Sequence, residues 1–318
     1  MSSQTDKPDQ TILFSVYWEL KVLLYLGVLL LSSGLGILIY KNIDTIGHQV
    51  IIGLVFALSA GCFYYCFKHG LPFSKQHVKT EGPLFDYSLL LGCLSFLTVI
   101  GYLQTEYTLF GNNYRLSTFI PMVVLFFMAY RFDHLGVLSM AITNLGIWLG
   151  VTATTFNFFT SSGYESRAVI FREDTLLYVY LGLGLLLIGL GYLSDRLDIK
   201  KHFRFTYQHF GVHMAFIALL SGYFSHFDDA TGLLWPLALF TLATLLYFDA
   251  LRHRSFYFIL LVCIYGYVAF SAMILKAFSK LQGDGLLYIA FLYFIISAFV
   301  LIKVLIAINR KIKGNDHL

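Results

Sequence analysis

The chain has 318 residues, of which 58% are hydrophobic and only 13% are charged. Soluble domains are about 45–50% apolar and about 25% charged, so this composition excludes an ordinary soluble globular protein. The formal net charge of +4 comes from basic residues spread over many segments, which is not the signature of a nucleic-acid-binding protein.

Ten stretches are long and apolar enough to serve as membrane-spanning helices, each of which needs about 20 such residues. In chain order they are Leu20–Tyr40, Gln49–Phe67, Leu84–Leu103, Tyr114–Tyr130, Leu135–Phe156, Asp174–Leu193, Phe205–Phe224, Leu233–Phe248, Ser255–Leu275 and Gly285–Ile308. The runs are continuously apolar and do not alternate, so they predict helices and exclude the strands of a transmembrane barrel. The fourth stretch is short and contains Pro121, which makes its ends the hardest to place.

We therefore predict an all-α integral membrane protein with three parts. Residues 1–19 form a short cytoplasmic segment, residues 20–308 a polytopic helical domain, and residues 309–318 a cytoplasmic tail. The first ten residues lack the basic region of a signal peptide, and no small-residue cleavage site follows the first apolar stretch. We expect this stretch to remain as the first helix.

The orientation follows from the positions of Lys and Arg, which accumulate in cytoplasmic loops. With ten spans, one set of segments holds 14 basic residues and the opposite set holds six. The larger set is Lys7, Lys68, Lys75, Lys79, Arg131, Arg196, Lys200, Lys201, Arg204, Arg252, Arg254, Arg310, Lys311 and Lys313. This bias predicts that both termini are cytoplasmic.

Two regions of the chain share a weak pattern. Gly101-Tyr102, a polar loop, Pro121 and Tyr130-Arg-Phe-Asp133 recur as Gly222-Tyr223, a polar loop, Pro236 and Tyr247-Phe-Asp249. A shift of four helices preserves orientation, so the pattern indicates a parallel internal repeat like those of some transporters. Chance is the alternative in a chain this rich in Gly, Phe and Tyr. A true repeat favours a shared structural role for the two aspartates, such as capping a helix.

Ionisable or polar groups within spans are costly in hydrocarbon and are candidates for function. The candidate polar cluster comprises Glu19, Asp86, Asp133, His134, Asn144, His209, His213 and Asp249. Most of these lie near a predicted helix end, where ordinary interfacial or loop charges are the alternative. His209 and His213 are four residues apart and share a helix face, but the spacing alone is too common to predict a metal site. Asn144 has a plain alternative role, a hydrogen bond to a neighbouring helix.

The functional hypotheses follow from what is present and what is missing. No nucleotide-binding loop, hydrolase motif or cofactor signature occurs, so we predict no cofactor and favour a non-enzymatic role. The first hypothesis is a transporter-like or flippase-like protein for a small or lipidic substrate, with a polar cavity near the midplane. The second is a membrane scaffold or regulator whose basic stretch binds anionic lipid headgroups through Arg196, Lys200, Lys201 and Arg204. The third is a membrane enzyme acting on a lipid-linked substrate.

Two segments resemble a family of bacterial multi-pass membrane proteins known as domain of unknown function 2157, in particular its Bacteroidetes-type members. The first runs from Tyr17-Trp-Glu-Leu-Lys21 through Ser33-Gly-Leu-Gly36 to Thr45-Ile-Gly-His48. The second is Phe119-Ile-Pro-Met followed by Ala129-Tyr-Arg-Phe-Asp-His-Leu-Gly136. The resemblance implies a bacterial inner-membrane protein and carries no catalytic residues with it. Unlike many relatives, the chain is expected to have no soluble helical segment before its first span.

Overall fold

The computed structural model describes residues 16–78, 82–160, 173–227, 230–279 and 286–314. Regular secondary structure in these ranges is helical throughout, with no strand. The elements are α1 (Val16–Ile46), α2 (His48–His69), α3 (Pro83–Tyr107), α4 (Tyr114–Phe132), α5 (Leu135–Thr160), α6 (Glu173–Arg196), α7 (Phe203–Ser225), the 3-10 helix η1 (Ala230–Leu233), α8 (Leu234–Arg252), α9 (Phe256–Ser279) and α10 (Leu286–Gly314). Each of the ten expected spans coincides with one observed α-helix, which confirms the predicted all-helical fold.

Within the described residues, eight helices are long and apolar enough to cross a membrane. The two outside this group are α1, whose apolar section is Val22–Leu38, and α7. Helix α7 has 23 residues, enough to cross about 30 Å at 1.5 Å per residue. Its apolar sequence is interrupted by Gln208, His209 and His213, which is why it differs from its neighbours.

Large apolar side chains cover the outer surfaces of the helices. Leu54 of α2, Phe127 of α4, Leu237 of α8 and Phe291 of α10 are all more than half exposed. In water such a surface would be an aggregation hazard, whereas lipid chains solvate it without cost. Helix α10 is the most exposed of these helices, because no residue of its apolar segment is buried.

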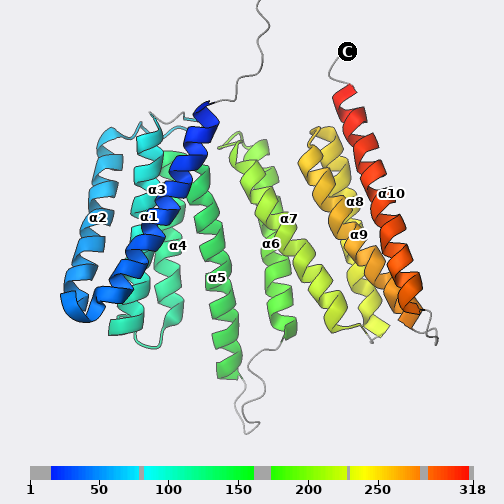
Figure 1. Ribbon diagram of the computed structural model, residues 1–318, viewed down its shortest axis with the longest axis horizontal. Helices are drawn as coiled ribbons and strands as arrows, with labels where there is room; N and C mark the ends of the chain where they lie inside the picture. Colours follow the sequence, from blue (N-terminus) through cyan, green and yellow to red (C-terminus); the bar gives the residue numbers. More distant parts are fainter. Residues whose placement is uncertain (1–15, 79–81, 161–172, 228–229, 280–285, 315–318) are drawn as a thin grey trace, which may run out of the picture. The chain divides into compact units, whose positions relative to one another are not determined.

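The chain forms two compact units, in each of which successive helices run antiparallel (Figure 1). The first unit consists of Met1–Thr152 together with Ser194–Thr206, and the second of Ala153–Leu193 together with Tyr207–Leu318. The end of α6, the α6–α7 connector (residues 197–202) and the start of α7 therefore belong to the first unit.

In the first unit α3 packs against α1, α2 and α4. Its contact with α2 is close because small residues meet there: a Cβ atom on Gly92 would lie 3.0 Å from Cys62 Cβ and from the ring of Phe63. The Ser59 hydroxyl donates a hydrogen bond of 3.0 Å to the Gly92 carbonyl. Small residues and hydroxyl groups are the usual means by which helices associate in lipid, where no hydrophobic force drives them together.

In the second unit α8 packs on α9 and α9 on α10. Tyr267 and Ser271 of α9 form hydrogen bonds of 2.9 and 3.1 Å with Ser297 and Tyr293 of α10. The apolar core contains Phe216, Leu239 and Ile259, all fully buried. Gly222 of α7 lies directly beneath the Trp235 ring of α8, which leaves no room for a side chain at that position.

The two regions of the suggested repeat differ in their local structure. Pro121 lies inside α4, whereas Pro236 occupies the first turn of α8, where a proline costs no helical hydrogen bond. Asp133 is the C-cap residue of α4, whereas Asp249 lies inside α8, whose C-cap residue is His253. The two aspartates therefore do not share a capping role, and the repeat remains a prediction.

Glycine residues at the contact between α6 and α7 allow the two helix backbones to pack closely. A Cβ atom on Gly184 would lie 2.6 Å from the backbone nitrogen of Ala215, and one on Gly211 would lie 2.8 Å from the Gly184 carbonyl oxygen. Gly182, on another face of α6, has nothing within 4 Å of its Cβ position.

We expect Gly184→Ala to lower the stability of the second unit by about 1–3 kcal/mol, because overpacking forces the two backbones apart. The matched variant Gly182→Ala should be neutral or slightly stabilising, since alanine favours the helix. Thermal unfolding of both variants in the same detergent checks this, and equal midpoints would contradict the close approach of α6 and α7.

Candidate functional site

Asp133 ends α4 in a left-handed conformation, with φ of 58°, and its backbone N–H donates to the Ala129 carbonyl. Aspartate is among the few residues that adopt this conformation readily, so the sequence suits the end of the helix. The turn directs the Asp133 side chain inward, where it is 1% exposed. A carboxylate in this position needs partners, because a buried charge without them is very costly.

Lys200, on the α6–α7 connector, supplies the compensating charge. Its ammonium lies 3.0 Å from Asp133 Oδ1 and its side chain is also 1% exposed. The ammonium lies 5.3 Å from the centre of the Phe73 ring, a favourable cation–π distance. Lys200 has a φ of 51°, and a lysine in this region costs on the order of 1–3 kcal/mol. The ion pair is therefore held by its surroundings rather than by local preference.

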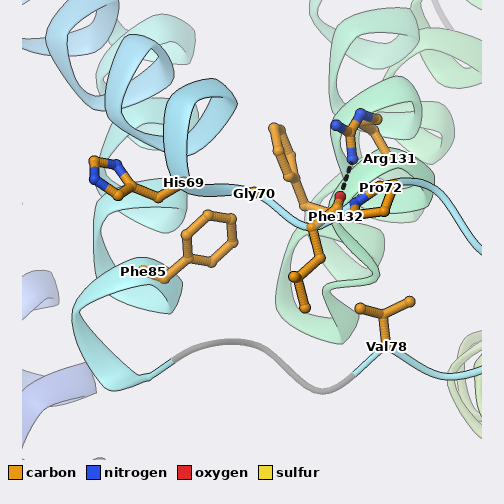
Figure 2. A pocket seen from close by; sticks show the side chains of 8 residues that line it. His69, Gly70, Pro72, Val78, Phe85, Arg131 and Phe132 are labelled. Carbon is orange, nitrogen blue, oxygen red and sulfur yellow. Dashed lines mark hydrogen bonds between the residues drawn. The ribbon is translucent and has the colours of Figure 1, made fainter.

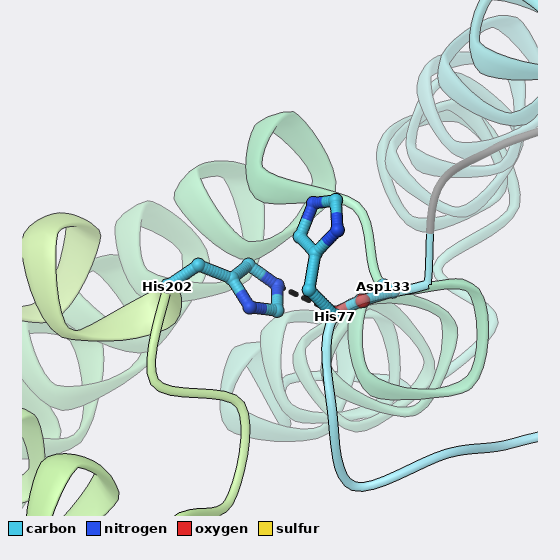
Figure 3. A group of neighbouring side chains, drawn as sticks. All are labelled: His77, Asp133 and His202. Atoms are coloured by element: carbon cyan, nitrogen blue, oxygen red, sulfur yellow. Dashed lines mark hydrogen bonds and ion pairs between the residues drawn. The ribbon is translucent and has the colours of Figure 1, made fainter.

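Two histidines complete the group (Figure 3). His202 Nε2 lies 2.7 Å from Asp133 Oδ1, and the His77 ring stands edge-on to the His202 ring with centroids 4.5 Å apart. Burial lowers the pKa of His202, while the Asp133 carboxylate opposes that shift. We call His77, Asp133, Lys200 and His202 the Asp133 cluster.

The loop from Gly70 to Val78 is fastened to this cluster by its backbone. Val78 N–H donates to Asp133 Oδ2 at 2.6 Å, and the Lys75 carbonyl accepts from the Lys200 N–H at 2.8 Å. Arg131 donates to the Leu71 carbonyl at 2.6 Å (Figure 2). These bonds give an irregular segment the partners that its backbone requires. Beside it lies a pocket of about 20 Å³, room for roughly one water molecule, lined by Phe85, Phe132 and others.

The connector itself is also fixed. The Ser194 hydroxyl donates to the carbonyls of Ile199 and Lys200, at 2.6 and 3.1 Å. Arg204 and Asp195 join the two ends of the connector through an ion pair of 2.5 Å. Lys200 and His202 are thus presented to Asp133 by a segment with its own hydrogen bonds and ion pair.

A second buried pair lies at the start of α3. Asp86 is 7% exposed, in the first turn of the helix, where the helix dipole favours a negative charge. His134 Nε2 lies 3.8 Å from Asp86 Oδ1, and His134 Nδ1 accepts the Val137 N–H at 3.2 Å. By accepting the Val137 N–H, the His134 side chain caps the start of α5.

In the second unit, His209 and His213 of α7 face two tyrosines of α9. Tyr257 Oη lies 2.5 Å from His209 Nδ1 and 3.5 Å from His213 Nε2. His213 Nδ1 lies 2.7 Å from Tyr265 Oη. These four residues form a continuous hydrogen-bonded line along the α7–α9 contact, which we call the His–Tyr seam.

The other expected site residues lie apart from both groups. Asn144 Oδ1 is buried in α5 and accepts no hydrogen bond from the described residues. Asp249 lies 3.3 Å from His253 on its own helix, an arrangement typical of a surface pair. The side chain of Glu19 lies outside the described residues. The candidate polar cluster therefore divides into Asp86, Asp133 and His134 in the first unit, His209 and His213 in the second, and scattered members.

The four basic residues expected to bind headgroups also divide. Lys200 does not fit that role, because its ammonium is buried against Asp133. Arg204 is 12% exposed and paired with Asp195, and Lys201 is exposed and 2.5 Å from Asp198. Arg196 is exposed.

Sequence reasoning did not find His77, His202 or the buried position of Lys200. All three lie outside the apolar spans, where charged side chains are common and give no sign of burial. The run Lys200-Lys201-His202, in which a histidine follows two lysines in a short connector, was the available sign of a polar site. Because it lies far from Asp133 in the sequence, the sequence did not indicate their contact.

Apolar helices of spanning length, lipid-solvated outer faces and buried polar groups at helix ends define a multi-pass helical membrane protein. Residues 2–138 match the family model described as predicted membrane protein (DUF2157), which confirms the resemblance over the segment from α1 to the start of α5. That segment includes His77 and Asp133 but not Lys200 or His202. No curated protein and no solved structure matches the chain.

Asp133→Asn should destabilise the first unit by about 3–5 kcal/mol, because it leaves the Lys200 ammonium buried without its counter-charge. Asparagine tolerates the left-handed conformation, so the effect isolates the charge. Asp198→Asn is the matched control, since Asp198 has a φ of 56° and pairs with Lys201 at the exposed surface. It should leave the thermal midpoint unchanged, and a similar loss in both variants would show that the buried pair is not the cause.

Proposed function

We propose that this protein is a transporter-like or flippase-like membrane protein for a small or lipidic substrate, and that the His–Tyr seam forms part of its route. The observation that supports this is the seam itself: two histidines and two tyrosines in contact between helices of spanning length. Polar groups at such positions are expensive in hydrocarbon and commonly mark substrate, ion or proton pathways. Histidine and tyrosine both donate and accept hydrogen bonds, so the line is suited to polar groups or protons.

The scaffold hypothesis has less support. Juxtamembrane basic residues contribute about 1 kcal/mol each to the binding of anionic lipid, so several exposed ones are needed. Of the four in the basic stretch, Lys200 is buried and Arg204 is largely covered by its ion pair with Asp195. The remaining two, Arg196 and Lys201, form a weak electrostatic surface.

The enzyme hypothesis also has less support. An acid–base or nucleophilic pair must be within reach of a substrate. Both oxygens of the Asp133 carboxylate already have partners, namely Lys200 and His202 on Oδ1 and the Val78 N–H on Oδ2. Neither oxygen is therefore placed to exchange a proton with a substrate.

To test transport, purified protein is reconstituted into liposomes and assayed for uptake of a panel of small solutes, for translocation of fluorescent lipids and for proton flux. We expect activity for one class and a reduction of about tenfold or more in the variant His213→Gln, which loses one of the two ring nitrogens at the centre of the seam. His253→Gln is the control, because His253 is an exposed histidine at the end of α8. Failure of the whole panel, or equal activity in both variants, would remove this proposal.

We also propose that the protein lies in a bacterial inner membrane with both termini in the cytoplasm. The uneven distribution of Lys and Arg supports this orientation. A fluorescent protein that folds only in the cytoplasm, fused after Leu318, should be bright, and alkaline phosphatase fused there should be inactive. The opposite pair of results would reverse the orientation.

A further inference from the structure

Three potential metal ligands meet in the Asp133 cluster. His77 from the α2–α3 loop, Asp133 from the end of α4 and His202 from the α6–α7 connector each offer an atom within 4.8 Å of the others. Figure 3 shows the three side chains together, with a dashed line for the interaction between His202 and Asp133. The three residues come from segments far apart in sequence, so their meeting is a product of the fold.

Two imidazoles and one carboxylate form the donor set that Zn²⁺ and similar first-row ions prefer. Such ions bind nitrogen and oxygen at about 2.0–2.2 Å, so tetrahedral ligands are about 3.3 Å apart. The widest spacing here must close by roughly 1.5 Å on binding. His77 is exposed and can make this movement by side-chain rotation. Asp133 Oδ1 and His202 Nε2 lie 2.7 Å apart and would move apart by about 0.6 Å to bind the same ion. A fourth position would remain for water.

The surroundings of the carboxylate are those of a metal ligand. The Val78 N–H binds Asp133 Oδ2 and fixes the orientation of the group, as partners outside the ligand set do in metal sites. Oδ1 is the oxygen that faces the Lys200 ammonium and the His202 imidazole. His202 Nε2 is the ring nitrogen that faces Oδ1, so it is the atom placed to bind an ion beside the carboxylate.

Lys200 is the competitor for this position. Its ammonium lies 3.0 Å from Oδ1 and supplies the positive charge that the buried carboxylate requires. A dication arriving between the imidazoles would supply that charge instead, and the two cations would repel each other.

We infer that His77, Asp133 and His202 bind a divalent transition ion of the Zn²⁺ type in exchange for the Lys200 ammonium. The ion would clamp the α2–α3 loop to the α6–α7 connector within the first unit. Magnesium and calcium, which prefer oxygen ligands, would not bind. This inference is independent of the transport proposal, which rests on residues of the second unit.

The test is calorimetric titration of the tag-free protein in nanodiscs with Zn²⁺, with Mg²⁺ as the negative probe. Wild-type protein should bind one Zn²⁺ per chain. His77→Ala should weaken binding by about tenfold or more, because loss of even an indirect partner costs that much. His77 is exposed, so this variant should fold normally.

Lys200→Met should tighten binding of Zn²⁺ by about tenfold or more, because it removes the competing charge. The neighbouring Lys201→Met is the matched control and should bind as the wild type does, since Lys201 points to the surface and pairs with Asp198. If the loss of a positive charge alone were responsible, both variants would gain affinity for Zn²⁺ equally. If the ion replaces the Lys200 ammonium, only Lys200→Met gains affinity.

Two results would overturn the inference. One is the absence of Zn²⁺ binding in wild-type protein and in Lys200→Met alike. The other is wild-type affinity in His77→Ala, which would place any bound ion elsewhere. If Lys200→Met does not fold, the comparison of wild-type protein with His77→Ala decides the question alone.

Discussion

The Asp133 carboxylate is the interaction on which the arrangement of the first unit depends. One group, almost completely buried, receives the Val78 N–H on one oxygen and lies against Lys200 and His202 with the other. It therefore joins the end of α4, the α2–α3 loop and the α6–α7 connector. Without it the Lys200 charge would have no counter-ion, and two irregular segments would lose an anchor. Burying both charges is costly, which makes a role beyond stability a reasonable expectation for this cluster.

The cluster and the seam solve the same physical problem in different ways. The first balances charge against charge at the end of the helices, where backbone groups are left without helical partners and can bond to side chains. The second uses hydrogen-bonded histidine and tyrosine rings within the helices, where an uncharged polar group costs far less than an ion. Each arrangement offers a function. The Asp133 cluster has a position where one cation could replace another, and the His–Tyr seam is a row of groups that both donate and accept hydrogen bonds.

Packing elsewhere relies on shape. Gly184, Gly211 and Gly222 allow neighbouring helices or rings to approach to a distance that a side chain would prevent. Other glycines within the helices, such as Gly34 and Gly36, have nothing near their Cβ positions. Glycine content therefore identifies helices suited to close contact, but only the facing residues determine which glycine is used.

The sequence by itself determined the number, order and approximate ends of the helices, because in lipid the backbone must satisfy its own hydrogen bonds and long apolar runs can do so only as helices. It also identified Asp86, Asp133, His134, His209 and His213 as groups whose burial needs a reason. It could not place Lys200, which belongs by composition to a basic stretch, or pair His77 and His202 with Asp133. His77, Lys200 and His202 lie 56, 67 and 69 positions from Asp133 in the sequence. Local pattern carries no information about such distances, so only the tertiary structure decided which charges meet and which remain at the surface.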